Sequence, residues 1–256
     1  MNKKRTLSTT ISVVLALILI AASLIGVSAV PLSPYIMVVP ETTIDETLTP
    51  GNTYTISIYT DYDWDTDVWS WQFSLTYNPA VLNGTTVVNG DLITTVKNAS
   101  AVFIPGDFNN TKGELDVTVG FFDPAYYDPP EYFSTSGPGT LAIVSFDVIG
   151  YGSSDIVLLE TKTRLDGVIG SFTYSIINGL VDWDHLGHGY FKNTLTGDAD
   201  GDGTVNVFDI LKVKYHWYPG PPAGAGGYDR DVDCDDDGSI NVFDILIVKA
   251  NWGDSV

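Results

Sequence analysis

The chain has 256 residues, 44% of them hydrophobic, with 32 acidic against 12 basic side chains and a formal net charge of −20. So acidic a protein is a poor match for a nucleic-acid partner, because phosphate binding depends on Lys and Arg. The single cysteine, Cys234, excludes an intrachain disulfide and is expected to be an exposed free thiol.

The first 29 residues have the pattern of an export signal. Lys3-Lys4-Arg5 precedes an apolar run from about Ile11 to Ile25, and Val27-Ser28-Ala29 supplies a small-residue cleavage site. Residues 1–29 are therefore predicted to be a signal peptide. An uncleaved membrane anchor is the alternative, because an apolar segment of roughly 20 residues can cross a bilayer. In both cases the rest of the chain is expected to be secreted or exposed at the cell surface.

Residues 30–184 predict an all-β domain. Short alternating or β-branched runs are broken by Gly, Pro, Asn and Asp, without a convincing helix pattern. Nine strands in this length favour a β-sandwich with a real core. The predicted strands are Tyr35–Val39, Tyr54–Thr60, Val68–Tyr77, Thr85–Val88, Ala101–Ile104, Leu115–Phe122, Thr140–Val148, Ile156–Thr161 and Phe172–Leu180. The predicted core members are Trp69, Phe73, Leu75, Val117, Val119, Leu141, Ile143 and Phe146.

Two segments of this domain resemble cohesins. Phe73-Ser-Leu75-Thr-Tyr77-Asn78-Pro79-Ala-Val81-Leu82 is similar to the F-x-L-x-Y-D-P-x-x-L strand and turn of that family, with Asn78 in place of the usual Asp. The segment from Gly137 to Val148 is similar to a later cohesin strand that follows a Gly turn. The resemblance implies a cohesin-like module over residues 30–184, with a nine-stranded jelly-roll fold.

No catalytic constellation is visible, so the protein is predicted not to be an enzyme. His185 and His188 fall within residues 185–196, a predicted linker, and lack further metal ligands on a rigid element. Carboxylates are too numerous for one acid–base pair to stand out. The aromatic loop from Phe122 to Phe133 could stack on a polysaccharide, but aromatic side chains tucked against the sandwich edge are the preferred interpretation.

The C-terminal part contains an internal duplication. Over the 20 positions from Asp198 to Trp217 and from Asp233 to Trp252, 13 residues are identical. Each copy opens with a twelve-residue loop that has oxygen donors at positions 1, 3, 5, 7, 9 and 12, the spacing of a calcium loop. Gly203 and Gly238 provide the sharp turn at position 6. The predicted ligands of two Ca²⁺ ions are Asp198, Asp200, Asp202, Thr204, Asn206 and Asp209, and Asp233, Asp235, Asp237, Ser239, Asn241 and Asp244.

A short helix is predicted after each loop. Asn206 and Asn241 stand at the N-cap position, Pro219 ends the first helix and Gly253 ends the second. Apolar residues at helical spacing predict a buried face on each helix, and the two units are expected to pack on each other. The two patterns are Val207, Ile210, Leu211 and Lys214, and Val242, Ile245, Leu246 and Lys249.

This tandem is similar to a dockerin over residues 197–256. The resemblance implies a non-catalytic module that folds around calcium and binds cohesins. One departure is the stretch from Pro219 to Gly227, which predicts a flexible or extended loop where dockerins carry a helical linker. The residues that the resemblance assigns to partner binding are Val207, Phe208, Lys214, Val242, Phe243 and Lys249. Helix phase cannot place both Val and Phe of each pair in a two-helix core, so Phe208 and Phe243 are expected to be exposed.

The sequence therefore predicts a secreted, non-catalytic assembly protein with a cohesin-like receptor and a dockerin-like plug in one chain. Its predicted partner is a cohesin or dockerin module of another protein or of another copy of itself, and head-to-tail pairing would build fibres or rings. The alternative is a surface carbohydrate-binding or adhesion protein tethered through its dockerin. A membrane is involved only if the N-terminal segment stays uncleaved.

Overall fold

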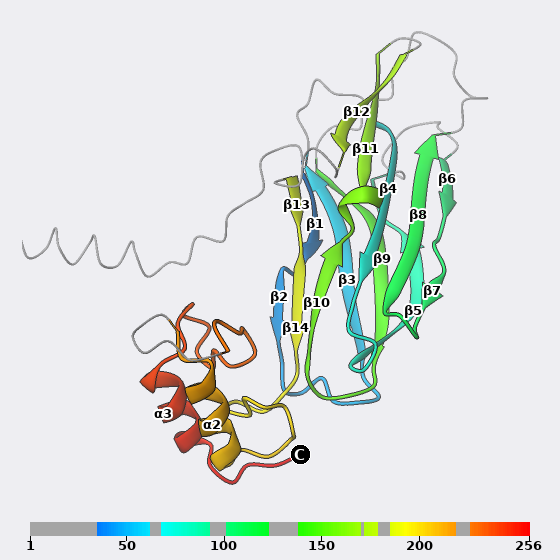
Figure 1. The fold of residues 1–256 in the computed structure, drawn as a ribbon. Helices are drawn as coiled ribbons and strands as arrows, with labels where there is room; N and C mark the ends of the chain where they lie inside the picture. Colours follow the sequence, from blue (N-terminus) through cyan, green and yellow to red (C-terminus); the bar gives the residue numbers. More distant parts are fainter. Residues whose placement is uncertain are drawn as a thin grey trace, which may run out of the picture. The chain divides into compact units, whose positions relative to one another are not determined.

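The computed structural model describes residues 35–61, 68–92, 101–122, 138–169, 172–178, 185–218 and 226–256. The predicted signal segment and most of the aromatic loop lie outside these residues, as does most of the stretch from Pro219 to Gly227. The described part is mainly β: a sandwich of two sheets followed by a two-helix region, which confirms the predicted fold class (Figure 1). Within it, no helix is both long and apolar enough to span a bilayer.

One sheet has five strands in the order β13-β1-β3-β9-β5. Neighbouring strands run antiparallel except for β13, which pairs parallel to β1. Their bounds are β1 Tyr35–Val39, β3 Thr53–Asp61, β5 Leu82–Asn89, β9 Gly139–Val148 and β13 Leu186–Gly187. The alternation of buried and exposed residues along β3 is that of a sheet with one face packed on a core.

The other sheet has nine strands, with the order β12-β11-β4-β10-β14-β2 and with β8 on the other side of β4. Two short strands, β6 and β7, pair with β8. The bounds are β2 Thr42–Ile44, β4 Val68–Thr76, β6 Ala101–Ile104, β7 Phe108–Asn109, β8 Glu114–Phe122, β10 Ser153–Leu158, β11 Arg164–Ile169, β12 Phe172–Asn178 and β14 Gly189–Lys192, with a 3-10 turn, η2, at Glu160–Lys162. All nine predicted strands are present, whereas β2, β7, β11, β13 and β14 were not predicted from the sequence.

Residues 185–196 are not the linker that the sequence predicts. Strand β13 pairs with β1 in one sheet, and β14 pairs with β10 and β2 in the other. This segment therefore ties the two sheets together. His188 belongs to it, and its Nδ1 accepts a hydrogen bond from the Leu158 amide at 3.2 Å. The sequence did not predict these two strands, because they are rich in Gly and His and too short to show an alternating pattern.

The core of the sandwich is built from large side chains of facing strands. Trp71, Phe73 and Leu75 of β4 and Phe146 of β9 are fully buried or nearly so. Of the predicted core members, Phe73, Leu75, Leu141 and Phe146 are confirmed, and the side chain of Trp69 lies outside the described set. Val117 and Val119 are only half-buried, because a register shift after Leu115 moves Thr118 and Gly120 into the inward phase of β8. Ile143 is half-buried because Val144 takes the inward phase of β9.

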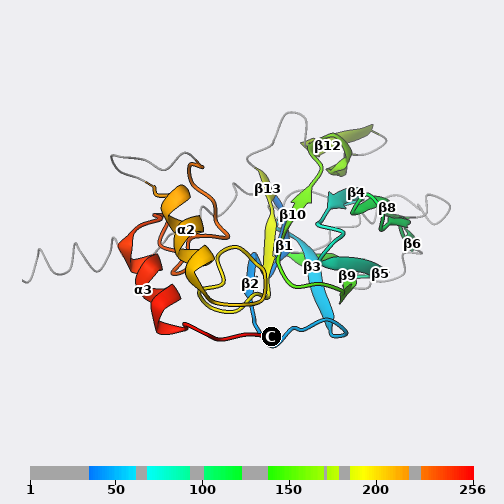
Figure 2. The ribbon, with the colours of Figure 1, turned by 60° about the horizontal axis from the view of Figure 1, so that its bottom comes forward.

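The C-terminal region has its own small core, which is built from two repeats that each contain one loop and one helix. Helices α2 (Val207–Tyr215) and α3 (Val242–Ala250) lie side by side in both views (Figure 1 and Figure 2). Its buried apolar residues are Ala199, Val205, Val213, Val232, Ile240 and Val248. Backbone hydrogen bonds also join the two repeats. The Val205 amide donates to the Asp254 carbonyl at 2.9 Å, and the Tyr218 amide donates to the Ile240 carbonyl at 2.7 Å. We call these two bonds the cross-bridges. Val205 and Ile240 occupy equivalent positions in the two repeats, so the cross-bridges are related by the duplication.

Candidate metal centre

Two carboxylate triads form at the positions where the sequence predicts calcium loops. One contains Asp198, Asp200 and Asp202, and the other contains Asp233, Asp235 and Asp237. Within each triad the carboxylate oxygens lie within 4.8 Å of one another. Positions 1, 3 and 5 of each loop thus converge on one point, as oxygen ligands of a hard cation must.

The loop backbone is wrapped around the first carboxylate of each triad. Asp198 is buried, and it accepts hydrogen bonds from the amides of Gly201, Asp202 and Gly203 at 2.9 to 3.1 Å. This turn needs a left-handed residue at position 6, where Gly203 has a φ of 84°. The same construction recurs in the second loop, where the amides of Asp237 and Gly238 donate to Asp233 at 3.2 and 2.9 Å.

The later ligand positions fasten each loop to its helix. Asn206 caps α2 by accepting from the Phe208 amide at 2.8 Å, as predicted for the N-cap. Asp209 is fully buried and accepts from the amides of Asp200 and Asn206, at 3.1 and 2.7 Å. The first turn of the helix and the loop are therefore one hydrogen-bonded unit.

The second loop repeats this arrangement. Asn241 caps α3 through the Phe243 amide, and Asp244 is buried and accepts from Cys234 and Asn241. Thr204 and Ser239 at position 7 use their backbone carbonyls to accept from the side-chain amides of the two capping Asn residues. The capping Asn side chain therefore bonds to the loop carbonyl at position 7 as well as to the helix start in both copies.

The electrostatics of the loops favour a bound cation. Burial, together with neighbouring carboxylates, raises the pKa of Asp198, Asp200 and Asp244 above the ordinary Asp value. Burial and the charges of Asp244, Asp237 and Asp233 raise the pKa of Asp235 to about 6. Like charges this close resist simultaneous ionisation, and a divalent cation removes that penalty. The donor set is entirely oxygen, which fits calcium.

Two features of the second loop were missed by sequence reasoning. Tyr228 donates its hydroxyl to Asp233 at 3.0 Å, and nothing in the first repeat signals this, because Asn193 occupies the equivalent position. Arg230 pairs with Asp236, which has a left-handed φ of 53°.

The expectation of an exposed thiol is wrong: Cys234 is half-buried against the small core, and burial raises the pKa of its thiol to about 12.

The predicted partner-binding residues are exposed at the starts of the two helices and along their first turns. Phe208 and Phe243 are exposed, as predicted, at 60% and 59%, and Val207 and Val242 are also exposed, at 48% and 49%. Leu211 and Leu246 join them, so most of the apolar face predicted to be buried instead points to solvent. The buried face is the one that carries Asp209 and Val213, because the carboxylate must point back into its loop. We call Val207, Phe208, Leu211, Val242, Phe243 and Leu246 the helix face.

Comparison with known proteins supports the two-part organisation. Residues 196–253 match the type I dockerin domain, and this match confirms the predicted C-terminal dockerin. Type I dockerin domains typically bind calcium. No curated protein matches the chain.

Among solved structures, the sandwich is similar to cohesins. One is the seventh ScaB type I cohesin from Pseudobacteroides cellulosolvens, at 14% identity and a TM-score of 0.42, covering 62% of this chain and 90% of that one. Another is a non-cellulosomal cohesin from Archaeoglobus fulgidus, at 18% identity and a TM-score of 0.38, covering 61% and 88%. A third is the third ScaC cohesin solved in complex with the ScaB dockerin from Acetivibrio cellulolyticus, at 13% identity and a TM-score of 0.42, covering 62% and 96%.

The ligand assignment predicts the effect of single substitutions. Asp198→Ala or Asp233→Ala removes the carboxylate around which its loop is wrapped, so each variant is expected to bind one calcium ion fewer than the natural protein. Cys234→Ser is the control, because the thiol sits between two ligand positions and donates to the Val232 carbonyl. Titration calorimetry counts the ions. An Asp variant that retains the full number rejects the assignment.

The raised pKa of Asp235 predicts opposite pH trends with and without calcium. The carboxyl group titrates at about 6 in the fold and near 3.9 in an unfolded chain, so its protonation stabilises the calcium-free fold below about pH 4 and that stabilisation is lost as pH rises through 6. Calcium needs the ionised form. The rise in melting temperature on calcium addition is therefore expected to be larger at pH 7 than at pH 5. An equal rise at both pH values contradicts this.

Proposed function

We propose that this protein is a secreted, non-catalytic assembly protein that binds a partner through its C-terminal module when that module holds calcium. The observation that carries the proposal is the helix face, an apolar surface held outward directly after the two calcium loops. Its six side chains are each between 48% and 60% exposed. Exposed large apolar side chains grouped at a helix start of a soluble protein mark an interaction site.

The dockerin match and the geometry point to the same partner class. In dockerins the helix starts bind cohesins, and here the same positions carry the exposed aromatic and aliphatic residues. Phe208 and Phe243 are suited to act as anchors, since a few large side chains carry most of the energy of a protein interface. Lys214 and Lys249 are exposed one to two turns further on and would contact acidic residues at the rim.

The duplication gives the module two related binding faces. The repeats share their caps, their buried Asp and their cross-bridges, so a rotation that exchanges α2 and α3 presents nearly the same surface. A partner could then dock in either of two orientations. The cohesin-like motifs in β4 and β9 suggest that the sandwich is itself a receptor, so the chain would serve as an adaptor between two proteins or assemble with copies of itself.

Two calcium ions, one per loop, are proposed to stabilise this fold, and the module is proposed to unfold when both are removed. The carboxylate triads repel themselves without a cation, and the small core of six apolar residues is too limited to compensate. An ion that binds only the folded form stabilises it by about 4 kcal/mol when calcium is a thousandfold above its dissociation constant.

Calcium removal is therefore expected to unfold the C-terminal module and leave the sandwich intact. Amides of α2 and α3 should exchange with deuterium within seconds in excess chelator and become protected with calcium, while amides of β3 and β9 stay protected in both. Mass spectrometry of peptic fragments from the full chain measures this. Helices that remain protected in chelator reject the calcium requirement.

Substitution of the anchor residues tests the two binding faces. Phe208→Ala and Phe243→Ala are each expected to weaken binding to a cohesin, or to a second copy of the chain, by less than tenfold, because the other face still serves. The double variant should abolish binding. Calorimetry with calcium present provides the affinities, and calcium stoichiometry serves as the folding control. If one single variant alone destroys affinity, only that repeat makes the contact.

A further inference from the structure

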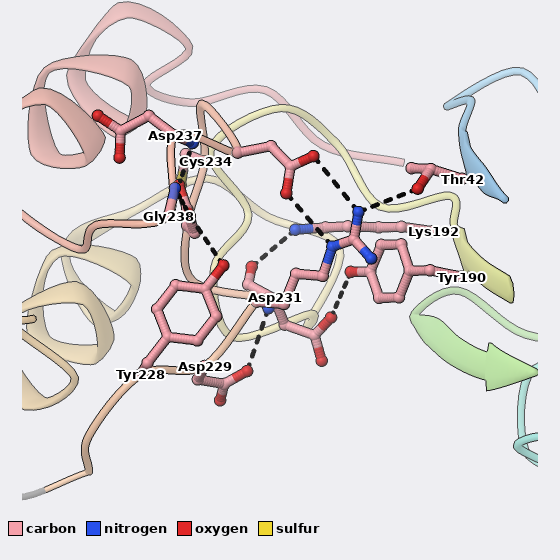
Figure 3. A network of polar contacts seen from close by, with 12 residues as sticks. Thr42, Tyr190, Lys192, Tyr228, Asp229, Asp231, Cys234, Asp237 and Gly238 are labelled. Carbon is pink, nitrogen blue, oxygen red and sulfur yellow. Dashed lines mark hydrogen bonds and ion pairs between the residues drawn. The ribbon is translucent and has the colours of Figure 1, made fainter. Parts of the chain in front are cut away.

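The segment that leads into the second calcium loop is fastened to the sandwich (Figure 3). Tyr190 of β14 donates its hydroxyl to the carboxylate of Asp231 at 2.7 Å. Lys192, on the same strand, donates to the backbone carbonyl of Asp231 at 2.6 Å. Two strand residues thus hold both the side chain and the main chain of one loop-entry residue.

Arg230 adds a second contact from the same segment. Its guanidinium lies 4.0 Å from the centre of the Tyr190 ring, and its terminal nitrogen donates to the hydroxyl of Thr42 in β2 at 3.1 Å. The ring of Tyr190 is nearly buried, and this burial, with the neighbouring Asp231 carboxylate, raises the pKa of its hydroxyl. The hydroxyl therefore keeps its proton and remains a donor to Asp231.

The same segment also holds the first ligand of the loop. Asp233 lies two residues after Asp231, and Tyr228 donates to its carboxylate at 3.0 Å. Arg230, besides its contacts with the sandwich, pairs with Asp236 inside the loop at 3.3 Å. Residues 228–233 are thus bonded to the sandwich on one side and to the calcium loop on the other (Figure 3).

The first loop is attached less firmly at the equivalent position. Thr196, two residues before Asp198, donates its amide and its hydroxyl to the carboxylate of Glu46. That contact is exposed, and contacts between exposed side chains contribute little. The second loop combines a nearly buried tyrosine with a lysine and an arginine at this position. The first loop is held further upstream instead, where the buried Asn193 bonds to Leu48, Gly150 and Gly152.

We propose that the sandwich and the second calcium loop are energetically coupled through the hydrogen bond from Tyr190 to Asp231. Docking of residues 228–233 on β14 places Asp233 for its ion, and a bound ion in turn tightens docking, because coupling between two binding events is reciprocal. Tyr190 is then a positioning residue for calcium, although it contacts no ligand atom directly. The helix face is exposed in this docked arrangement, so docking orients it without covering it.

This inference rests on the proposed calcium sites, and one substitution tests the coupling separately from calcium binding itself. Tyr190→Phe in the full chain deletes the hydroxyl and keeps the ring under Arg230. Tyr77→Phe is the matched control, because that hydroxyl bonds to Asn110 within the sandwich. Both variants are made in the Asp198→Ala background, where calorimetry reports the second loop, and in the Asp233→Ala background, where it reports the first.

The expected result is a loss of calcium affinity at the second loop of roughly fivefold or more in Tyr190→Phe, with the first loop unchanged and Tyr77→Phe without effect. Hydrogen exchange in β2 and β14 should also slow on calcium addition in the natural chain but not in Tyr190→Phe. Equal affinities for the two tyrosine variants at the second loop overturn the coupling alone. A natural chain that binds no calcium overturns the proposed function and the coupling with it.

Discussion

The C-terminal module of this protein depends on the repulsion among carboxylates that its loops bring together. Three Asp oxygens within 4.8 Å of one another cannot all be ionised at low cost, and backbone amides offset that cost only at the first carboxylate of each triad. Backbone amides orient the first carboxylate of each triad, and the buried Asp at position 12 is tied to the amides around it. The loop is thus shaped for a cation that the protein itself does not supply.

The same constraint determines what the helices expose. Asp209 and Asp244 must point back into their loops, and this fixes the rotation of each helix about its axis. With that rotation Val213 and Val248 turn inward, and the Val-Phe pair at each helix start turns outward. Ion binding and the apolar surface are therefore two consequences of one residue position. This explains how a module with so small a core can present so apolar a surface.

The sequence was sufficient where a residue type has a local physical requirement. The left-handed turns at Gly203 and Gly238, the Asn206 and Asn241 caps and the exposure of Phe208 and Phe243 all follow from chemistry within about a dozen residues. The sequence was insufficient where a residue's pairing or hydrogen-bonding partner lies far away in the chain. The strands at 186–192 are specified by pairing with β1, β10 and β2, and the role of Tyr190 depends on a contact with Asp231, 41 residues further along the chain. Helix periodicity also misassigned the buried face, because it recognises apolar residues but not the buried Asp that sets the rotation.

The most direct test of the account is binding of the full chain to purified type I cohesins, and to itself, measured by calorimetry in calcium and again in excess chelator. The account predicts binding to at least one of these partners in calcium and none in chelator, with binding restored when calcium is returned. Affinity that persists in chelator, or a calcium-loaded chain that binds none of these partners, would contradict the claim that the ion-dependent fold exists to present the helix face.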